Sequence, residues 1–227
     1  AMPLLEIRGL ARHFGGGRAL DGVDLDVAQG EIVGLIGPNG AGKTTLFNCV
    51  TGVLPATSGT IRFGRESRES LAGLSPHQIV QYGIARTFQN IRLFGGLSVL
   101  ENVLVGTFIR THSGLVSAIL RSPEVRREER WARDRAMGLL GFVGLAERAE
   151  EQAGALPFGL QLVQLIRQLR DQGLTVLLIE HDMQVVMPIS DRVAVLDEGR
   201  KIADGPPQAI QQDPGVIEAY LGAPHTP

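Results

Sequence analysis

A glycine-rich stretch near the amino terminus constrains the fold of this chain more than any other feature. Residues 37–44 fit the phosphate-binding pattern G-x-x-x-x-G-K-[ST]. The largely apolar residues 31–36 before it are typical of a buried strand, and residues 44–50 after it can begin a helix. An ordinary glycine-rich turn needs no lysine followed by threonine, so this order of strand, loop and helix predicts a nucleoside triphosphate site.

Each part of this loop has an expected role in binding nucleotide. Glycines let successive backbone N–H groups turn toward the phosphates, and the helix N-terminus adds its dipole. Lys43 would reach the terminal phosphates, and the Thr44 hydroxyl would ligate magnesium. The residues that we expect to bind nucleotide here are Gly37, Pro38, Asn39, Gly40, Ala41, Gly42, Lys43, Thr44 and Thr45.

Size and composition exclude several other classes of protein. A chain of 227 residues with 44% hydrophobic content can form one large α/β domain or a domain with a small lobe. Its net charge of −2 gives no electrostatic footprint for nucleic acid, so no DNA or RNA partner is expected. The single cysteine, Cys49, is expected to pack as a small hydrophobe, and it fits a reducing, cytoplasmic setting. The longest apolar run, residues 174–179, suits a strand, so we expect neither a membrane span nor a signal peptide.

Hydrophobic periodicity divides the chain into three parts. Alternating apolar residues before the loop, with a further strand at 60–63, predict an antiparallel β lobe. Residues from about 97 to 148 have helical patterns, including a helix start at Ser122 and Pro123. Residues 160–169 repeat apolar positions at helical spacing and precede a buried strand at 175–180, which is the alternation of an α/β fold.

We therefore expect an α/β fold with a P-loop core, in which helices flank a mainly parallel sheet. An N-terminal antiparallel β lobe and a helical subdomain complete a single nucleotide-binding domain over residues 1–227. Its expected parts are the β lobe and P-loop core at 4–95, the helical subdomain at 96–158, and the return of the core with a C-terminal segment at 160–227.

Three residues outside the loop are further candidates for the site. His181 directly follows the strand at 175–180, where open α/β sheets bind ligands, which favours a contact to the γ-phosphate over a purely structural role. Gln89 could ligate magnesium or place a water molecule, or it could be an ordinary surface amide. Phe14 could stack on a purine, with a place in the core of the lobe as its alternative.

Together these motifs resemble the ATP-binding subunits of ABC transporters, in the order of that family and over almost the whole chain. The loop corresponds to the family's Walker A motif, Phe14 to its adenine-stacking A-loop, Gln89 to its Q-loop and His181 to its H-loop. The first half of the signature motif corresponds to Leu156, Pro157, Phe158 and Gly159.

Three longer stretches look like one branch of the family. Residues 83–94, 179–183 and 213–222 resemble the subunit of branched-chain amino acid importers. The closest competing branch is the lipopolysaccharide-export ATPase. A soluble ABC protein of DNA repair or translation is a further alternative, but the chain has neither a basic surface nor a second cassette.

The resemblance implies a mechanism and a set of partners. Two such subunits sandwich two ATP molecules, each loop facing the other subunit's signature, and closure drives the membrane partners while hydrolysis resets the cycle. ATP and Mg²⁺ are the expected cofactors, with catalytic roles for His181, Gln89 and Lys43 and magnesium contacts from Thr44 and Gln89. The expected partners are integral membrane permease subunits, a second identical or different ATP-binding subunit, and indirectly a periplasmic or extracellular binding protein. The expected location is the cytoplasmic side of the cell membrane, as a peripheral subunit.

One motif of the family is missing. Leu156 and His181 are only 25 positions apart, and no Walker B strand ending in Asp-Glu lies between them. The absent piece would hold about 30 residues of helix, strand and loop. Gly159 runs directly into apolar residues without a capping residue, which suggests that the two sides of a missing segment are joined there. The rival hypothesis is a true deletion, which would leave a pseudo-ATPase that binds nucleotide only for regulation.

A second Asp-Glu pair imitates the missing motif. Residues 193–198 consist of four apolar residues followed by Asp197 and Glu198. They follow His181 instead of preceding it, and residues 199–205 read as the return of a hairpin. This segment therefore predicts two short paired strands and not a Walker B motif.

Overall fold

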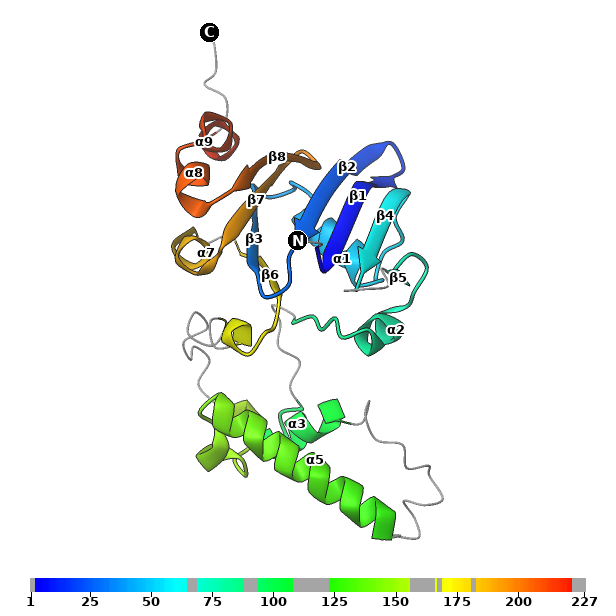
Figure 1. Cartoon of the computed structure of the whole chain (residues 1–227), viewed down its shortest axis with the longest axis vertical. Helices are drawn as coiled ribbons and strands as arrows, with labels where there is room; N and C mark the ends of the chain where they lie inside the picture. Colours follow the sequence, from blue (N-terminus) through cyan, green and yellow to red (C-terminus); the bar gives the residue numbers. More distant parts are fainter. Residues whose placement is uncertain are drawn as a thin grey trace. The chain divides into compact units, whose positions relative to one another are not determined.

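The computed structural model describes residues 3–64, 69–87, 94–107, 123–155, 166, 169–180 and 183–221. The chain forms two compact units, one of residues 1–85 and 161–227 and one of residues 86–160 (Figure 1). The first unit contains β1 (Leu5–Phe14), β2 (Gly17–Val27), β3 (Ile32–Ile36), α1 (Lys43–Val50), β4 (Ser58–Phe63), β5 (Glu69–Ser70), α2 (Pro76–Gln81), β6 (Val176–Ile179), α7 (Met183–Ile189), β7 (Arg192–Asp197), β8 (Arg200–Gly205), α8 (Pro207–Gln211) and α9 (Pro214–Leu221). The second contains α3 (Val99–Thr107), α5 (Pro123–Phe142) and the short 3₁₀ helices η2 (Ala146–Arg148) and η3 (Ala153–Ala155).

The predicted antiparallel lobe is confirmed by a sheet with the strand order β2-β1-β4-β5. Strands β1 and β2 form a hairpin in which Phe14 pairs with Gly17 across the turn. Strand β4 pairs antiparallel with the other edge of β1 (Figure 1). The alternating apolar residues that predicted the lobe, Val23, Leu25 and Val27, all lie in the core, as expected when one face of such a sheet is buried.

The strand that leads into the glycine loop occupies the middle of a second sheet, with the order β6-β3-β7-β8. Strand β3 runs parallel to β6 on one side and to β7 on the other. All five of its residues are buried, because both faces are covered: Val33 and Leu35 pack in the cluster shared with the lobe, and Ile36 packs in a cluster with α7 and α9. Burial on both faces explains its continuous apolar sequence.

The hairpin predicted at residues 193–205 is confirmed. Strands β7 and β8 pair antiparallel across the turn at Glu198 and Gly199. Asp197 therefore ends an inner strand, and Glu198 begins the turn that follows it. This pair resembles a Walker B motif only because an apolar strand happens to end in a polar turn.

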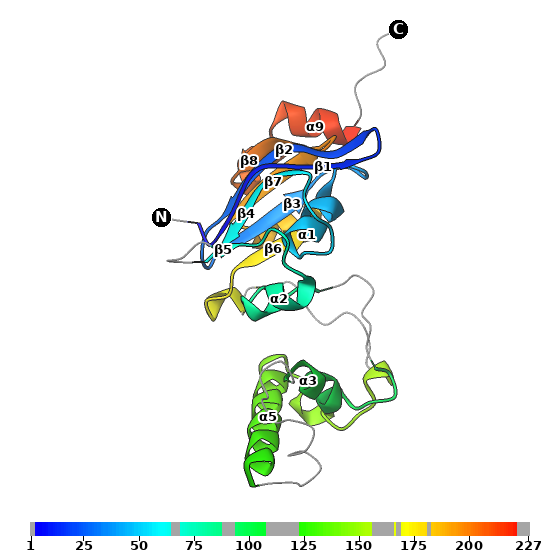
Figure 2. The same cartoon turned by 90° about the vertical axis from the view of Figure 1, so that its right-hand side faces the viewer.

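One hydrophobic cluster joins the two sheets of the first unit. It combines residues of β1, β2 and β4 with residues of β3, β7 and α1, and these elements can be followed in Figure 2. Cys49 of α1 lies in this cluster with 5% of its surface exposed, so its predicted role as a small hydrophobe is confirmed. Burial raises the pKa of its thiol.

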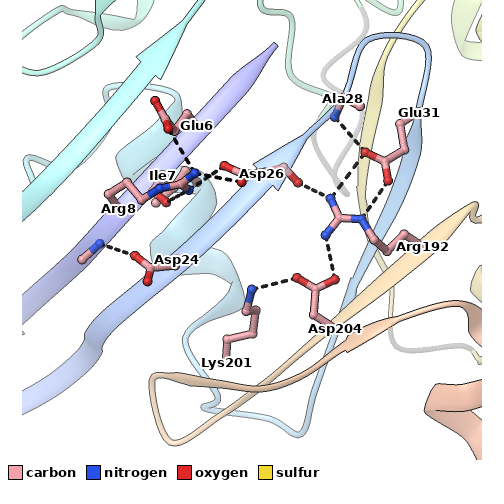
Figure 3. A network of polar contacts seen from close by, with 11 residues as sticks. Glu6, Ile7, Arg8, Asp24, Asp26, Ala28, Glu31, Arg192, Lys201 and Asp204 are labelled. Atoms are coloured by element: carbon pink, nitrogen blue, oxygen red, sulfur yellow. Dashed lines mark hydrogen bonds and ion pairs between the residues drawn. The ribbon is translucent and has the colours of Figure 1, made fainter. Parts of the chain in front are cut away.

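A network of ion pairs also joins the two sheets (Figure 3). The Arg192 guanidinium of β7 donates to Glu31 Oε1 at 2.8 Å, to Asp204 Oδ1 at 2.7 Å, and to the backbone carbonyl of Asp26 in β2. Lys201 Nζ adds a bond of 2.7 Å to Asp204. The hydrogen bonds to Glu31 and Asp204 raise the pKa of Arg192, so this hub stays charged at every ordinary pH.

A glycine lets helix α7 approach β3 closely. A Cβ atom at Gly34 would lie 2.5 Å from Val186 Cγ1 and 2.8 Å from Ser190 Oγ. Ser190 is 8% exposed, and its hydroxyl has no hydrogen-bond partner among the residues that the structure describes. A buried hydroxyl without a partner contributes nothing to stability.

We therefore expect Ser190→Ala to leave the free energy of unfolding unchanged or to raise it by up to about 1 kcal/mol. Urea denaturation measures this change. Ser75→Ala is the matched control, because Ser75 forms a capping box with Gln78 at the start of α2, and its loss should cost about 1 kcal/mol. A loss of similar size for both variants would contradict the expectation for Ser190.

The second unit is helical in its described part. A capping box begins α3: the Glu101 N–H donates to Ser98 Oγ at 3.1 Å, and the Ser98 N–H donates to Glu101 Oε2 at 2.8 Å. Helix α5 begins at Pro123, as the sequence predicted. The two helices share an apolar cluster that includes Leu100 and Leu140. None of the described helices is long and apolar enough to span a bilayer.

Candidate nucleotide-binding site

The glycine loop joins the carboxyl end of β3 to the start of α1. Gly37 and Gly42 both have positive φ, at 148° and 101°, where a side chain is strained. Both also touch neighbouring backbone: an added Cβ would lie 2.0 Å from the Leu196 carbonyl oxygen at Gly37, and 2.5 Å from the Ala19 carbonyl oxygen at Gly42. These two positions require glycine for conformation and for space.

The turn between β7 and β8 is hydrogen-bonded to the glycine loop. The Gly199 N–H donates to the carbonyl of Ala41 at 3.1 Å, and the Asp21 N–H of β2 donates to the Gly199 carbonyl at 2.9 Å. The turn thus links the loop to the antiparallel lobe. The sequence predicted this hairpin but gave no sign of its contact with the loop.

Lys43 reaches back across the loop. Its Nζ donates to the carbonyls of Gly37 and Pro38, each at 2.7 Å. Burial lowers the pKa of the ammonium. The ammonium therefore links the end of the loop to the carbonyls at its start. A phosphate oxygen could replace these carbonyls as its partner.

The start of α1 is suited to an anion. The N-cap residue, Gly42, offers no side-chain hydrogen bond, and the first turn contains no acidic residue. The first N–H groups of a helix lack partners within the helix, and its dipole is positive at this end. Thr44 is exposed and Thr45 half-buried in this first, positively polarised turn.

Phe14 lies at the end of the lobe that meets the loop. Its partner across the hairpin is Gly17 of β2. Ala19, also in β2, contacts Gly42 of the loop. Phe14 is 48% exposed, and the Arg12 guanidinium lies 4.6 Å from the centroid of its ring. Phe14 is therefore a surface residue and not part of the lobe's core.

One residue of this site was missed by sequence reasoning. The Gly37 N–H donates to the hydroxyl of Tyr220, in α9, at 2.8 Å. Nothing in the loop motif calls for a tyrosine, and the two residues are 183 positions apart. Only the spatial position of α9 reveals the contact.

The other candidates are not placed by the structure. Gln89, His181 and the signature residues Leu156, Pro157, Phe158 and Gly159 lie outside the described residues, and their roles stay predictions. The described part of the chain contains no group of three or more His, Cys, Asp or Glu side chains that could hold a metal ion.

Two family models match the chain. One, described as "ABC transporter", covers residues 20–178. The other, described as "Branched-chain amino acid ATP-binding cassette transporter", covers residues 200–226. The second match contains all of α8 and α9, and with them Tyr220.

Curated relatives match over nearly their full length. The high-affinity branched-chain amino acid transport ATP-binding protein LivG of Escherichia coli is 41% identical over 255 positions, covering 98% of this chain and 99% of LivG. BraF of Pseudomonas aeruginosa, which carries the same description, is 40% identical over 253 positions, covering 97% and 98%. The alignment with LivG has 255 positions, but this chain has only 227 residues. At least 28 of the aligned positions are therefore gaps in this chain.

Solved structures of the same fold are similar as well. The ADP conformation of MJ1267, an ATP-binding cassette of an ABC transporter, matches with a TM-score of 0.82 at 28% identity, covering 98% of this chain and all of that chain. A nucleotide-free ATP-binding cassette from an ABC transporter matches with a TM-score of 0.79 at 28% identity, covering 97% and 100%.

Proposed function

This chain belongs to the ABC transporter family and is one of its ATPases, and from that premise we propose that it energises an importer of branched-chain, hydrophobic amino acids. The observation that carries the substrate class is the 41% identity with LivG over nearly the whole of both chains. The match of the more specific family model at residues 200–226 adds independent support.

ATP would bind with its phosphates in the loop. The amides at the start of α1 and the Lys43 ammonium supply positive charge there, and Lys43 already lies across the loop. Exchange of its carbonyl partners for phosphate oxygens would place this charge where it stabilises the transferring phosphoryl group. Gln89 and His181 would complete the contacts to magnesium and to the γ-phosphate.

The oxygen donors available here suit Mg²⁺. Thr44 offers an exposed hydroxyl in a turn without acidic residues, so phosphate oxygens would supply most of the coordination. Magnesium favours such sites, with few protein ligands and several from substrate. When bound, it would neutralise charge on the β- and γ-phosphates.

We further propose that the active protein contains a segment of about 30 residues between Gly159 and Leu160, with the Walker B aspartate and the catalytic glutamate. The gaps in the alignment with LivG support this. Strand β6 supports it too: it lies at an edge among the described strands of its sheet. Its four apolar residues are only half-buried, whereas those of β3 are fully buried, which suggests that β6 lacks a covering neighbour.

The intact mass of the purified protein tests this segment. A mass about 3 kDa above 24.4 kDa, the value for about 30 additional residues, is expected. A mass of 24.4 kDa would instead favour the true deletion, and with it a subunit that binds nucleotide without hydrolysing it.

The proposed partners are integral membrane permease subunits, a second ATP-binding subunit and, indirectly, a periplasmic or extracellular binding protein. The proposed location is the cytoplasmic face of the cell membrane, and no nucleic acid is involved, in keeping with the net charge of −2. Affinity purification of the tagged chain from its own cells, in mild detergent with ATP, should recover integral membrane subunits. Recovery of none would count against transport and favour a soluble ABC protein.

We expect Phe14→Ala to raise the Kd for ATP about 5- to 150-fold, the range for loss of one stacked base. The Kd for inorganic tripolyphosphate should stay unchanged, because that ligand has no base. The melting temperature should change little, since Phe14 is 48% exposed. Isothermal titration calorimetry measures both affinities. Phe94→Ala, at a phenylalanine that is 58% exposed in the other unit, is the control. Equal weakening of ATP and tripolyphosphate would exclude stacking on Phe14.

A further inference from the structure

The C-terminal helix of the described chain touches the first residue of the nucleotide loop. Tyr220 lies in the last turn of α9, and its hydroxyl accepts a hydrogen bond of 2.8 Å from the Gly37 N–H. Gly37 is buried, and a buried N–H needs a partner. The tyrosine therefore satisfies a backbone group at the point where β3 becomes the loop.

Helix α9 is capped at its start and packs against the core beside the loop. At its start, Asp213 Oδ1 accepts hydrogen bonds from the N–H groups of Gly215 at 2.9 Å and Val216 at 3.1 Å. Val216 is 2% exposed and belongs to the same cluster as Ile36, the residue before Gly37. Tyr220 is four residues after Val216 and so lies on the same face of the helix. Packing of Val216 thus aims Tyr220 at the loop.

Gly37 is in turn one of the two residues that hold Lys43. Its N–H is bound by Tyr220, and its carbonyl accepts the Lys43 ammonium at 2.7 Å. Its α-carbon lies against the Leu196 carbonyl, so there is no room for it to shift toward β7. The orientation of Gly37 therefore sets one of the two carbonyls that hold the lysine, and Pro38, the next residue, supplies the other.

Tyr220 keeps the protonation state that this contact needs. Burial raises the pKa of its phenol, although the N–H of Gly37 opposes this by stabilising the phenolate. The hydroxyl is therefore neutral at ordinary pH, and its oxygen remains free to accept a hydrogen bond.

We propose that Tyr220 is a positioning residue for the nucleotide loop: through Gly37 it fixes one of the two carbonyls that hold Lys43, and so prepares the loop for the triphosphate. This inference rests on ATP binding at residues 37–45. It assigns a role in nucleotide binding to the C-terminal segment, which lies outside the match to the general family model.

Tyr220→Phe tests the proposal, because phenylalanine keeps the ring and removes only the hydroxyl. Calorimetry should show the Kd for ATP and the Kd for inorganic tripolyphosphate both rising by at least about 5-fold, since the loss acts at the phosphate end of the site. Tyr82→Phe is the matched control. Tyr82 is the only other tyrosine of the chain and is 43% exposed, and its replacement should leave both constants unchanged.

A second measurement follows the contact directly. Amide exchange of Gly37, observed by NMR relative to Gly34 within β3, should become at least about 5-fold faster in Tyr220→Phe. Unchanged affinities in this variant would overturn the proposal, including the case in which only the melting temperature falls. Unchanged protection of the Gly37 amide would overturn it as well. Failure of the unaltered protein to bind either ligand would instead refute ATP binding at this loop.

Discussion

Gly37→Ala is expected to lower the free energy of unfolding by about 2–6 kcal/mol and to abolish ATP binding. The added Cβ would lie 2.0 Å from the Leu196 carbonyl oxygen. The oxygen belongs to the backbone of β7, and Gly37 directly follows β3, which pairs with β7 up to Ile36 and Val195. A flexible side chain could turn away from such a clash, but here β3 and β7 must separate.

Two physical effects add at this position. Overpacking costs about 1–3 kcal/mol, and a side chain at φ 148° adds strain of about 1–3 kcal/mol. Binding is lost because separation of the strands also moves the Gly37 carbonyl, which holds Lys43 at 2.7 Å. Urea denaturation followed by circular dichroism measures the stability, and calorimetry measures the affinity for ATP.

Gly22→Ala is the control for this prediction. Gly22 also has positive φ, at 77°, but a Cβ there meets nothing within 4 Å. It should show the strain alone, about 1 kcal/mol, with unchanged affinity for ATP. If the two variants lose the same stability, the contact between Gly37 and Leu196 does not constrain the loop.

Arg192→Met is expected to lower the free energy of unfolding by about 2–4 kcal/mol. Methionine keeps much of the apolar stem but removes the charge that joins Glu31, Asp204 and the Asp26 carbonyl (Figure 3). Breaking a fully buried ion pair costs about 3–5 kcal/mol. The side chain of Arg192 is 25% exposed, which reduces this range.

Partial compensation also reduces the effect. After the substitution, Glu31 still accepts the Ala28 N–H at 2.7 Å, and Asp204 still pairs with Lys201 at 2.7 Å. The Asp26 carbonyl loses its guanidinium partner, Glu31 loses both of its contacts with the guanidinium, and Asp204 loses one of its two cation partners. Less than a fifth of either carboxylate side chain is exposed. Urea denaturation at low and at high salt measures the change, which should persist at high salt because the pairs are shielded from solvent.

Arg8→Met provides the matched control in the same network. Arg8 also contacts two carboxylates, Glu6 and Asp26, but its side chain is 44% exposed. An exposed pair contributes at most about 1 kcal/mol, and salt screens it. Equal losses for both arginine variants would show that burial does not distinguish the two sites.

Several features of the chain were predictable because they are local. The glycine loop takes its N–H groups from consecutive residues and its flanks from the strand and helix on either side, so β3 and α1 followed directly from residues 31–50. The alternation of Val23, Leu25 and Val27 predicted the antiparallel lobe, since one face of such a sheet is buried. The same local patterns predicted the hairpin of β7 and β8 in place of a Walker B motif.

The candidate site was predictable only in part. The roles of Gln89, His181 and residues 156–159 come from a resemblance and remain predictions, because these residues lie outside the described part of the chain. For Phe14, the sequence left stacking and core packing open, and the exposed fraction of 48% excluded the core. Exposure depends on everything that packs around a side chain, which a single stretch of sequence does not contain.

The sequence by itself determined the triphosphate loop and its order between strand and helix, because backbone conformation and hydrophobic periodicity are properties of neighbouring residues. Only the tertiary structure decided what fixes that loop in place. Leu196 lies close to Gly37, the Gly199 N–H donates to the Ala41 carbonyl, and the Tyr220 hydroxyl accepts the Gly37 N–H. These partners come from β7, the following turn and α9, far along the chain. Strand register and the packing of Val216 bring them to the loop, and neither can be deduced from the loop's own residues.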